Sequence, residues 1–200
     1  MKKFAGFLFL GGGVGLFFAG LLHPHGQPGQ DFHTVVSSMI SNPMWETTHK
    51  IALVSAMMIV CSLSLLAGEA GSRAGLACVR LGISATLFIA IDFAVEVAAR
   101  TDAARYANGE PSAIIALVDA LQTVGWPVFA ASFIGLAVST RLTPLWLSVV
   151  GMIGAAALGV GGLVVQGFHV AALAPVFIAG DLLPIWMVGA GVQLMRGTPL

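Results

Sequence analysis

Apolar residues in this chain fall into six long runs, separated by short breaks rich in polar residues, glycine and proline. The runs extend over 4–22, 45–67, 74–99, 112–139, 144–166 and 174–195. A helix needs about 20 mostly apolar residues to cross the hydrocarbon core of a membrane, and each run is long enough. The pattern predicts an all-α integral membrane protein, a six-transmembrane-helix bundle that forms a single domain over 1–200.

The connection between the first two runs has a pattern of its own. Apolar residues recur there at the helical spacing i, i+3, i+4, i+7 and i+8, and these residues are Phe32, Val35, Val36, Met39 and Ile40. Polar residues lie between them, which predicts a short amphipathic helix over 31–41 in the membrane interface or capping the bundle. Asn42 and Pro43 then fit the N-cap and the first position of the next helix.

Composition supports a membrane protein and excludes several partners. Of the 200 residues, 58% are hydrophobic and 9% are charged, against roughly 25% charged in a soluble domain. The formal net charge is zero, so we expect no nucleic acid partner. Membrane lipid is the expected partner, with other membrane-protein subunits as the alternative. Cys61 and Cys78 lie in apolar stretches without a CxxC motif, and we interpret them as core residues.

The distribution of Lys and Arg predicts the orientation, because cytoplasmic connections are enriched in both. With the N-terminus inside, the cytoplasmic cations are Lys2, Lys3, Arg73, Arg80, Arg141 and Arg196, against Lys50, Arg100 and Arg105 outside. This favours a multi-pass inner-membrane protein with both termini in the cytoplasm. The N-terminal run also fits a secretory signal, but it is long enough to span and no small-x-small cleavage site follows it, so we expect it to be the first helix.

Polar residues gather at one membrane boundary in this topology. All the histidines fall at or beyond the outer surface, and they are His23, His25, His33, His49 and His169. The outer halves of the third, fourth and sixth spans carry Asp92, Glu96, Asp119, Gln122 and Asp181, while Glu46 opens the second. A charged side chain in the hydrocarbon region costs about 2.5 to 3.5 kcal/mol on insertion scales. Several of them at the same depth therefore imply a polar cavity or pairing with one another. A structural alternative is a stripe on one helix face in which Glu96 pairs with Arg100.

Two sets of histidines are candidate ligands. Glu46 and His49 have the i, i+3 spacing with which one helix offers a carboxylate and an imidazole to one metal, and His23 and His25 end the preceding span on the same side. The candidate metal ligands are therefore His23, His25, Glu46 and His49, and the candidate cofactor ligands are His23, His49 and His169. Imidazole with carboxylate favours iron or zinc, and haem b is the organic alternative. Histidines also occur at membrane surfaces without any metal.

Proline and missing motifs narrow the chemistry further. Pro127 and Pro184 follow polar residues in the fourth and sixth spans, where each proline frees a backbone carbonyl. There is no GxxxxGK[ST] loop, no HExxH and no GxSxG motif, and no span has a lysine in its interior that could hold retinal. Nucleotide hydrolysis, zinc-protease chemistry and a serine hydrolase elbow therefore have no support.

The sequence favours a protein with an outer-side cluster of histidines and carboxylates that binds haem b or a metal, or an accessory subunit of a membrane complex. One alternative is a small-solute or proton-coupled transporter that uses Asp92, Glu96, Asp119 and Asp181. Another is a membrane-embedded metal-dependent hydrolase. A purely structural bundle is the fourth. The pattern predicts no catalytic residue and leaves open whether the protein is an enzyme.

Overall fold

Six helices are long and apolar enough to cross a membrane in the computed structural model, which describes residues 1–26, 29–140 and 142–198. Four of the spans contain α1 (Lys2–Leu22), α3 (Met44–Leu66, continued by a 3-10 turn to Glu69), α4 (Arg73–Ala99, continued to Ala107) and α6 (Ala113–Ser139). The fifth is α7 (Leu145–Val160) with the turn that follows it to Gln166, and the sixth is the segment Ala171–Met195, which ends in α9 (Leu182–Met195). No strand occurs in these described ranges. The predicted all-α fold of a multi-pass membrane protein is confirmed, with span boundaries close to those expected.

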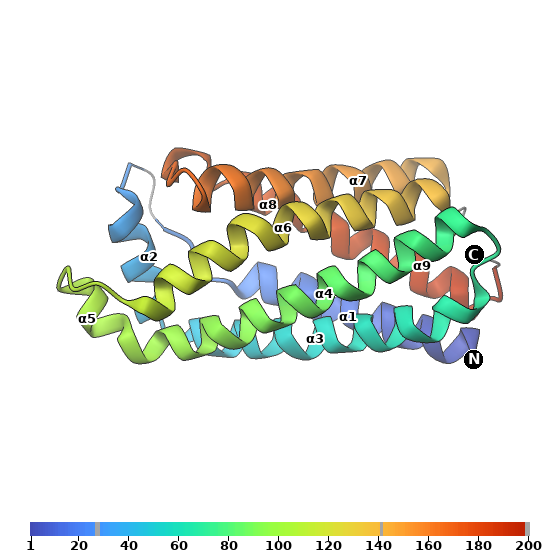
Figure 1. Cartoon of the computed structure of the whole chain (residues 1–200), viewed down its shortest axis with the longest axis horizontal. Coiled ribbons are helices and arrows are strands. Elements are labelled where there is room, and N and C mark those ends of the chain that lie inside the picture. Colours follow the sequence, from blue (N-terminus) through green and yellow to red (C-terminus); the bar gives the residue numbers. More distant parts are fainter. Residues whose placement is uncertain (27–28, 141, 199–200) are drawn as a thin grey trace.

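The six long helices form a closed ring. In chain order, each packs against the next, and α9 returns to pack against α1. A shorter helix, α8 (Val176–Gly180), leads into α9 and packs against α7. Figure 1 shows the long helices side by side along one axis, with both termini at the same end of the bundle. Ring closure leaves an interior that side chains from all six helices can reach.

Two short helices lie at the end of the bundle away from the termini (Figure 1): α2 (Phe32–Ser41) and α5 (Ala103–Ala107). The predicted amphipathic helix is therefore confirmed as α2. Its N-terminus is capped by Asp31, whose carboxylate accepts from the Thr34 amide at 3.0 Å. The following helix begins at Met44, so Pro43 takes the N-cap position that was predicted for Asn42, while the Asn42 side chain accepts from the Met44 amide at 2.9 Å.

Glycines let neighbouring helices approach until their backbones touch. A Cβ at Gly6 would lie 2.7 Å from the Gly191 carbonyl oxygen, so α1 and α9 are in backbone contact there. A Cβ at Gly154 would lie 2.2 Å from the Leu183 amide nitrogen, which places α7 equally close to the start of α9. The small residues thus serve packing within the bundle, as expected for helices in lipid.

The half of the bundle nearer the termini is filled by large apolar side chains. Phe9, Phe133, Trp186 and Met187 are at most 2% exposed, and the rings of Phe9 and Trp186 meet edge to face with centroids 6.0 Å apart. The Trp186 indole donates to the Thr143 hydroxyl at 3.0 Å. This core closes the interior of the bundle towards the termini.

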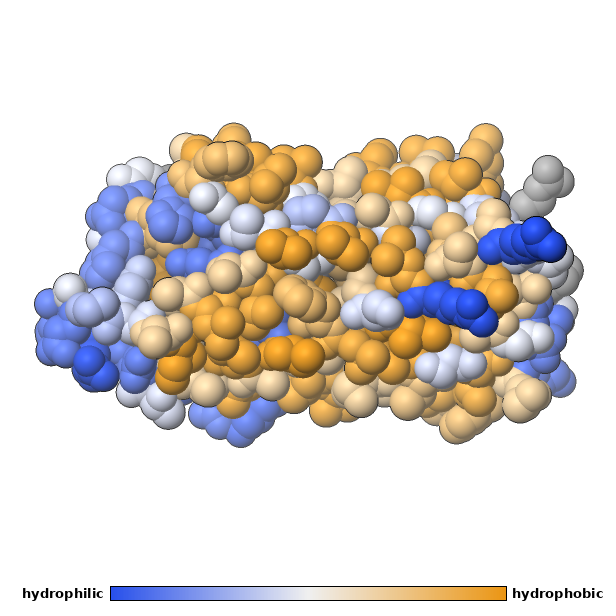
Figure 2. All heavy atoms as spheres, in the orientation of Figure 1, coloured by the Kyte–Doolittle hydropathy of each residue, from blue (hydrophilic) through white to orange (hydrophobic). Residues whose placement is uncertain are grey.

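The outer surface is apolar along most of its length. Many large side chains point outwards, among them Phe7, Val54, Ile91, Val124 and Ile153. Figure 2 shows this apolar surface along the bundle and hydrophilic residues gathered at the end formed by α2 and α5. Such a surface matches a lipid environment. Arg141, which the orientation argument counts, lies outside the described residues.

Candidate functional site

A cavity of about 890 Å³ lies inside the ring, at the end that α2 covers. We call it the chamber. Its floor is formed by residues from the middle of the long helices, and its roof includes Val35, Val36, Met39 and Ile40 of α2. Most lining side chains are apolar or aromatic, and a few polar groups converge on one wall. Binding sites for small molecules and cofactors have volumes of roughly 300 to 1,000 Å³ and this same composition.

His49 lies in the chamber wall with both ring nitrogens engaged. The ring is 3% exposed, and its Nδ1 lies 2.6 Å from the Trp45 carbonyl oxygen, one helical turn earlier on α3. Because a carbonyl only accepts, Nδ1 must carry the hydrogen. The Nε2 atom lies 3.2 Å from Oε2 of Glu96 on α4. A second hydrogen therefore lies between Nε2 and Oε2, on one atom or the other.

Glu96 connects three helices. Its Oε1 accepts from the Gln122 side-chain amide of α6 at 2.6 Å, while its backbone carbonyl accepts from the Trp45 indole at 2.7 Å. Trp45, His49, Glu96 and Gln122 thus form one hydrogen-bonded network across α3, α4 and α6. All four residues are buried and all four border the chamber. A network in which each member is held by another fixes the geometry of the polar wall.

Asp92 lies one turn before Glu96 on the same face of α4, and it does not border the chamber. It is fully buried, and neither carboxyl oxygen has a hydrogen-bond partner among the described residues. The Gln122 amide is a neighbour, but its hydrogen bond goes to Glu96. An ionised carboxylate without a partner is costly to bury. Asp92 is thus a second acidic group within reach of the network and out of reach of a molecule in the chamber.

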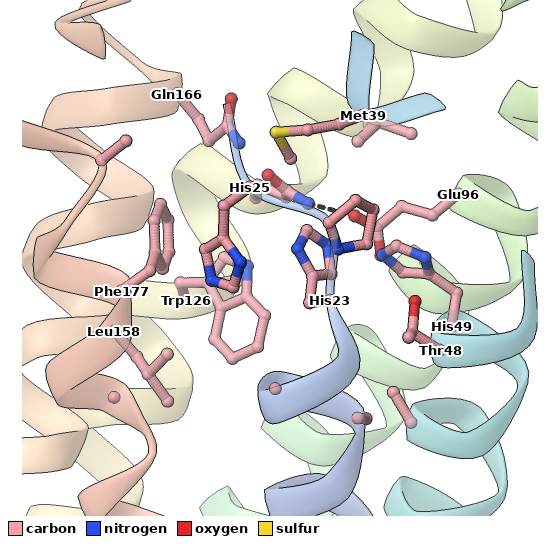
Figure 3. A pocket seen from close by; sticks show the side chains of 18 of the residues that line it. His23, His25, Met39, Thr48, His49, Glu96, Trp126, Leu158, Gln166 and Phe177 are labelled. Atoms are coloured by element: carbon pink, nitrogen blue, oxygen red, sulfur yellow. Dashed lines mark hydrogen bonds and ion pairs between the residues drawn. The ribbon is translucent and has the colours of Figure 1, made fainter. Parts of the chain in front are cut away.

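His23 and His25 extend into the chamber from the connection after α1. Figure 3 shows the His23 ring next to His49 and Glu96, and the His25 ring on the other side of His23. The His23 ring centroid is 5.1 Å from that of His49 and 5.4 Å from that of Trp45. Burial lowers the pKa of His23 to about 3, and the neighbouring His49 and His25 rings add to this effect. His23 is therefore a neutral imidazole at neutral pH, able to donate or accept a hydrogen bond or to ligate a metal.

The mouth of the chamber is held by contacts between α2 and its neighbours. The Phe32 ring at the start of α2 stacks on His169 with centroids 4.3 Å apart and planes at 11°. His169 has φ +55°, a conformation that residues other than glycine rarely adopt, and its Nε2 lies 3.8 Å from Oδ2 of Asp119. On the other side, His33 Nε2 lies 2.7 Å from the Tyr106 carbonyl oxygen. These contacts fix α2 across the opening.

Irregular helix geometry surrounds the chamber. After α7, residues Gly161–Gln166 form a π turn, and Gln166 borders the chamber. The sixth span is interrupted before Pro184, because α8 ends at Gly180 and α9 begins at Leu182. Pro127 does not interrupt α6, although its missing N–H frees the carbonyl one turn earlier. A π turn inside a helix often marks a functional site.

The structure brings most of the predicted site residues together. Those that border the chamber are His23, His25, His49, Glu96, Asp119, Gln122 and Asp181. Asp92 does not border the chamber, and His169 lies at the mouth beside Asp119 rather than next to His23 and His49. Two features carry no signal in the sequence: the Trp45 indole donates to the Glu96 carbonyl, and Gln166 borders the chamber.

Two contacts expected from the sequence are not formed, one at the predicted metal site and one between Glu96 and Arg100. Glu46 is exposed and pairs with Lys50 one turn later on the same helix, outside the chamber. Arg100 does not pair with Glu96, because its guanidinium donates to the carbonyl oxygens of Ile40 and Asn42 at the end of α2. In the described part of the chain, no group of three or more His, Cys, Asp or Glu side chains is arranged to hold a metal ion. The predicted four-residue metal site is therefore not assembled.

Comparison of the chain with protein-family models, with curated proteins and with solved structures gives no match. Function is therefore inferred from the geometry of the chamber.

Proposed function

We propose that this protein binds a lipid-soluble organic molecule in the chamber, as a cofactor or as a carried solute. The observation that supports this proposal is the cavity of about 890 Å³, which is largely apolar and has a hydrogen-bonding wall formed by His49, Glu96 and Gln122. An apolar body would occupy the aromatic and aliphatic lining. A polar end would meet His23 and the network of His49, Glu96 and Gln122. Such a division matches the usual design of a small-molecule site.

The charge of the lining narrows the class of molecule. Glu96, Asp119 and Asp181 border the chamber, and none of the described lining residues is Lys or Arg. An anionic ligand would meet carboxylates without a cationic partner, which disfavours haem b with its two propionates. Haem b stays the alternative occupant, and His23 would be the residue to hold its iron because both nitrogens of His49 are engaged. A neutral or cationic molecule suits the lining better.

Carriage of the molecule across the membrane is the second candidate function. The specific observation in its favour is the set of helix irregularities around the chamber, namely the π turn after α7 and the break between α8 and α9. Transporters place interrupted helices at their binding sites. The test measures uptake of the bound molecule into vesicles that contain the protein. If Asp119→Asn and Asp181→Asn leave this uptake unchanged, the second function is excluded. A metal-dependent hydrolase is not proposed, because the described residues form no three-ligand metal site.

The charge asymmetry of the sequence supports an inner-membrane location with both termini in the cytoplasm, so that the chamber opens to the periplasm. An accessory role beside other membrane subunits remains compatible with the lipid-facing surface. A cysteine introduced at position 110, in the connection before α6, can be labelled with a membrane-impermeant reagent to show on which side of the membrane the chamber lies. Labelling from the cytoplasm alone would contradict this orientation.

The proposal is tested by identifying what copurifies with the protein. Gently solubilised protein is examined by absorption spectroscopy, elemental analysis and native mass spectrometry, and its organic extract by mass spectrometry. We expect a small organic molecule bound at up to one per chain. Ala174→Trp at the chamber lining should abolish it, whereas the matched Ala94→Trp, on the exposed face of α4, should not. Equal retention by both variants, or no bound organic molecule and no binding of an added apolar probe, would refute the proposal.

A further inference from the structure

Aromatic rings and carboxylates border the chamber together. Trp45, Phe93, Trp126 and Phe177 supply ring faces, and Glu96 supplies a carboxyl group on the same wall as Trp45. The negative face of an aromatic ring attracts an organic cation, and a carboxylate in a dry site attracts it more strongly. Because the described lining contains no Lys or Arg, such a cation would meet no like charge except a protonated histidine.

The network behind this wall has an excess of acidic groups. His49, Glu96 and Asp92 are all at most 3% exposed. Full ionisation of the three would leave one uncompensated negative charge in the interior, which is costly. The form without net charge has one proton shared by His49 and Glu96 and another on Asp92. Loss of one proton from this form creates a negative charge that only a cation in the chamber can balance.

We propose that the chamber binds a lipophilic organic cation, and that binding releases one proton from the cluster of His49, Glu96 and Asp92. This inference rests on the proposed function and names its ligand class. The cation brings one positive charge into the chamber, the carboxylate of Glu96 becomes its counter-ion, and one proton leaves to water. No covalent bond forms or breaks, and the net charge of the site is the same before and after the exchange.

The groups that surround Glu96 are compatible with this exchange. From α3 it is faced by His49 and from α6 by Gln122, and Asp92 is its acidic neighbour on α4. Asp119 of α6 and His23 of the connection after α1 also border the chamber. Arg100 is engaged by carbonyl oxygens at the end of α2. Asp119 lies towards the mouth beside His169. Glu96 is thus the carboxyl group of the network that borders the chamber directly.

The test compares a cation with a neutral analogue of similar shape. Purified protein in detergent micelles is titrated with tetraphenylphosphonium or with neutral triphenylphosphine oxide, by calorimetry in two buffers that differ in ionisation enthalpy. We expect about one proton released per bound cation, and an affinity for the cation that rises up to about tenfold per pH unit. The neutral analogue should bind without proton release and independently of pH.

Variants separate the contribution of the cluster from general binding. Glu96→Gln keeps hydrogen-bonding atoms for Gln122 and His49 but should abolish proton release and weaken binding of the cation at least tenfold, with binding of the neutral probe retained. The control Glu46→Gln removes an exposed carboxylate outside the chamber and should behave like the unaltered protein. Binding of the neutral probe with no preference for the cation, or with no proton release, overturns this inference alone. Failure of both probes to bind overturns it together with the proposed function.

Discussion

The hydrogen bond between Gln122 and Glu96 joins α6 to α4 in the chamber wall, and a double-mutant cycle can measure its strength. Gln122→Met and Glu96→Met each remove one partner while keeping an unbranched side chain of similar length. The coupling energy is the difference between the loss of unfolding free energy in the double variant and the sum of the two single losses. The cycle cancels the effect of each substitution on other contacts, including that of Glu96 with His49.

The structure indicates a coupling above the usual value for membrane proteins. Hydrogen bonds between transmembrane helices couple by about 0.6 kcal/mol on average and by about 1.7 kcal/mol at most in such cycles. The contact here is short, at 2.6 Å, and both residues are at most 6% exposed. A hydrogen bond to a charged acceptor contributes about 1.5 to 3 kcal/mol. We therefore expect a coupling of about 1.5 kcal/mol, near the upper end of the membrane range.

Unfolding free energies are obtained by titrating SDS into mixed micelles and following circular dichroism. Gln193→Met is the matched control, because Gln193 accepts a hydrogen bond from Thr198 near the C-terminus, far from the chamber. Its combination with Glu96→Met should be additive within about 0.5 kcal/mol. A coupling between Gln122 and Glu96 at or below the membrane average of about 0.6 kcal/mol would refute a charge-assisted network.

Three further predictions concern packing, pH and the mouth of the chamber. Gly154→Ala places a methyl group against the Leu183 backbone and should cost about 1 to 3 kcal/mol in the same SDS titration, whereas Gly68→Ala, in open space, should change stability by less than about 0.5 kcal/mol. His23 has a folded-state pKa of about 3 against 6.5 in the unfolded chain, so the unfolded state binds more protons and stability falls as pH drops below 6.5. His23→Asn should reduce the loss of unfolding free energy between pH 7 and pH 5 by about 1 to 2 kcal/mol, and an unchanged pH profile would contradict the low pKa. Phe32→Ala removes the stacking on His169, worth about 0.5 to 1.5 kcal/mol, and should speed amide hydrogen exchange in α2 but not in α9. Equal exchange rates of α2 in this variant and in the unaltered protein would show that the stacking does not hold α2.

Sequence patterns predict the helices well because lipid imposes a simple rule. A span must satisfy its backbone hydrogen bonds internally, so about 20 apolar residues in a row imply a helix. The spacing of apolar residues at i, i+3, i+4, i+7 and i+8 likewise predicts α2. It does not predict the π turn over Gly161–Gln166, because hydropathy carries no information about the winding of a helix. Nor does it predict ring closure between α1 and α9, which depends on the contact of Gly6 with Gly191.

The site is predicted in part. Topology alone places the histidines and the carboxylates at one end of the bundle, but the partner of each side chain depends on tertiary packing. Glu96 has Arg100 at i+4, and yet it pairs with His49 from another helix, because Arg100 extends to the end of α2. One signal was present for Glu46. Lys50 follows it at i+4, the favoured spacing for an ion pair on a helix surface, which indicates an exposed position.

The π turn after α7 amounts to one extra residue inserted into an otherwise regular helix. The wider turn absorbs that residue, so removal of Gly161 or Gly162 would restore regular winding and leave Gln166 on its side of the span. The same deletion in the regular part of α7 would rotate every later position by about 100° and turn Gln166 away from the interior. Two single-residue deletions a few positions apart would thus have opposite effects on the lining, a contrast that no alanine scan would reveal.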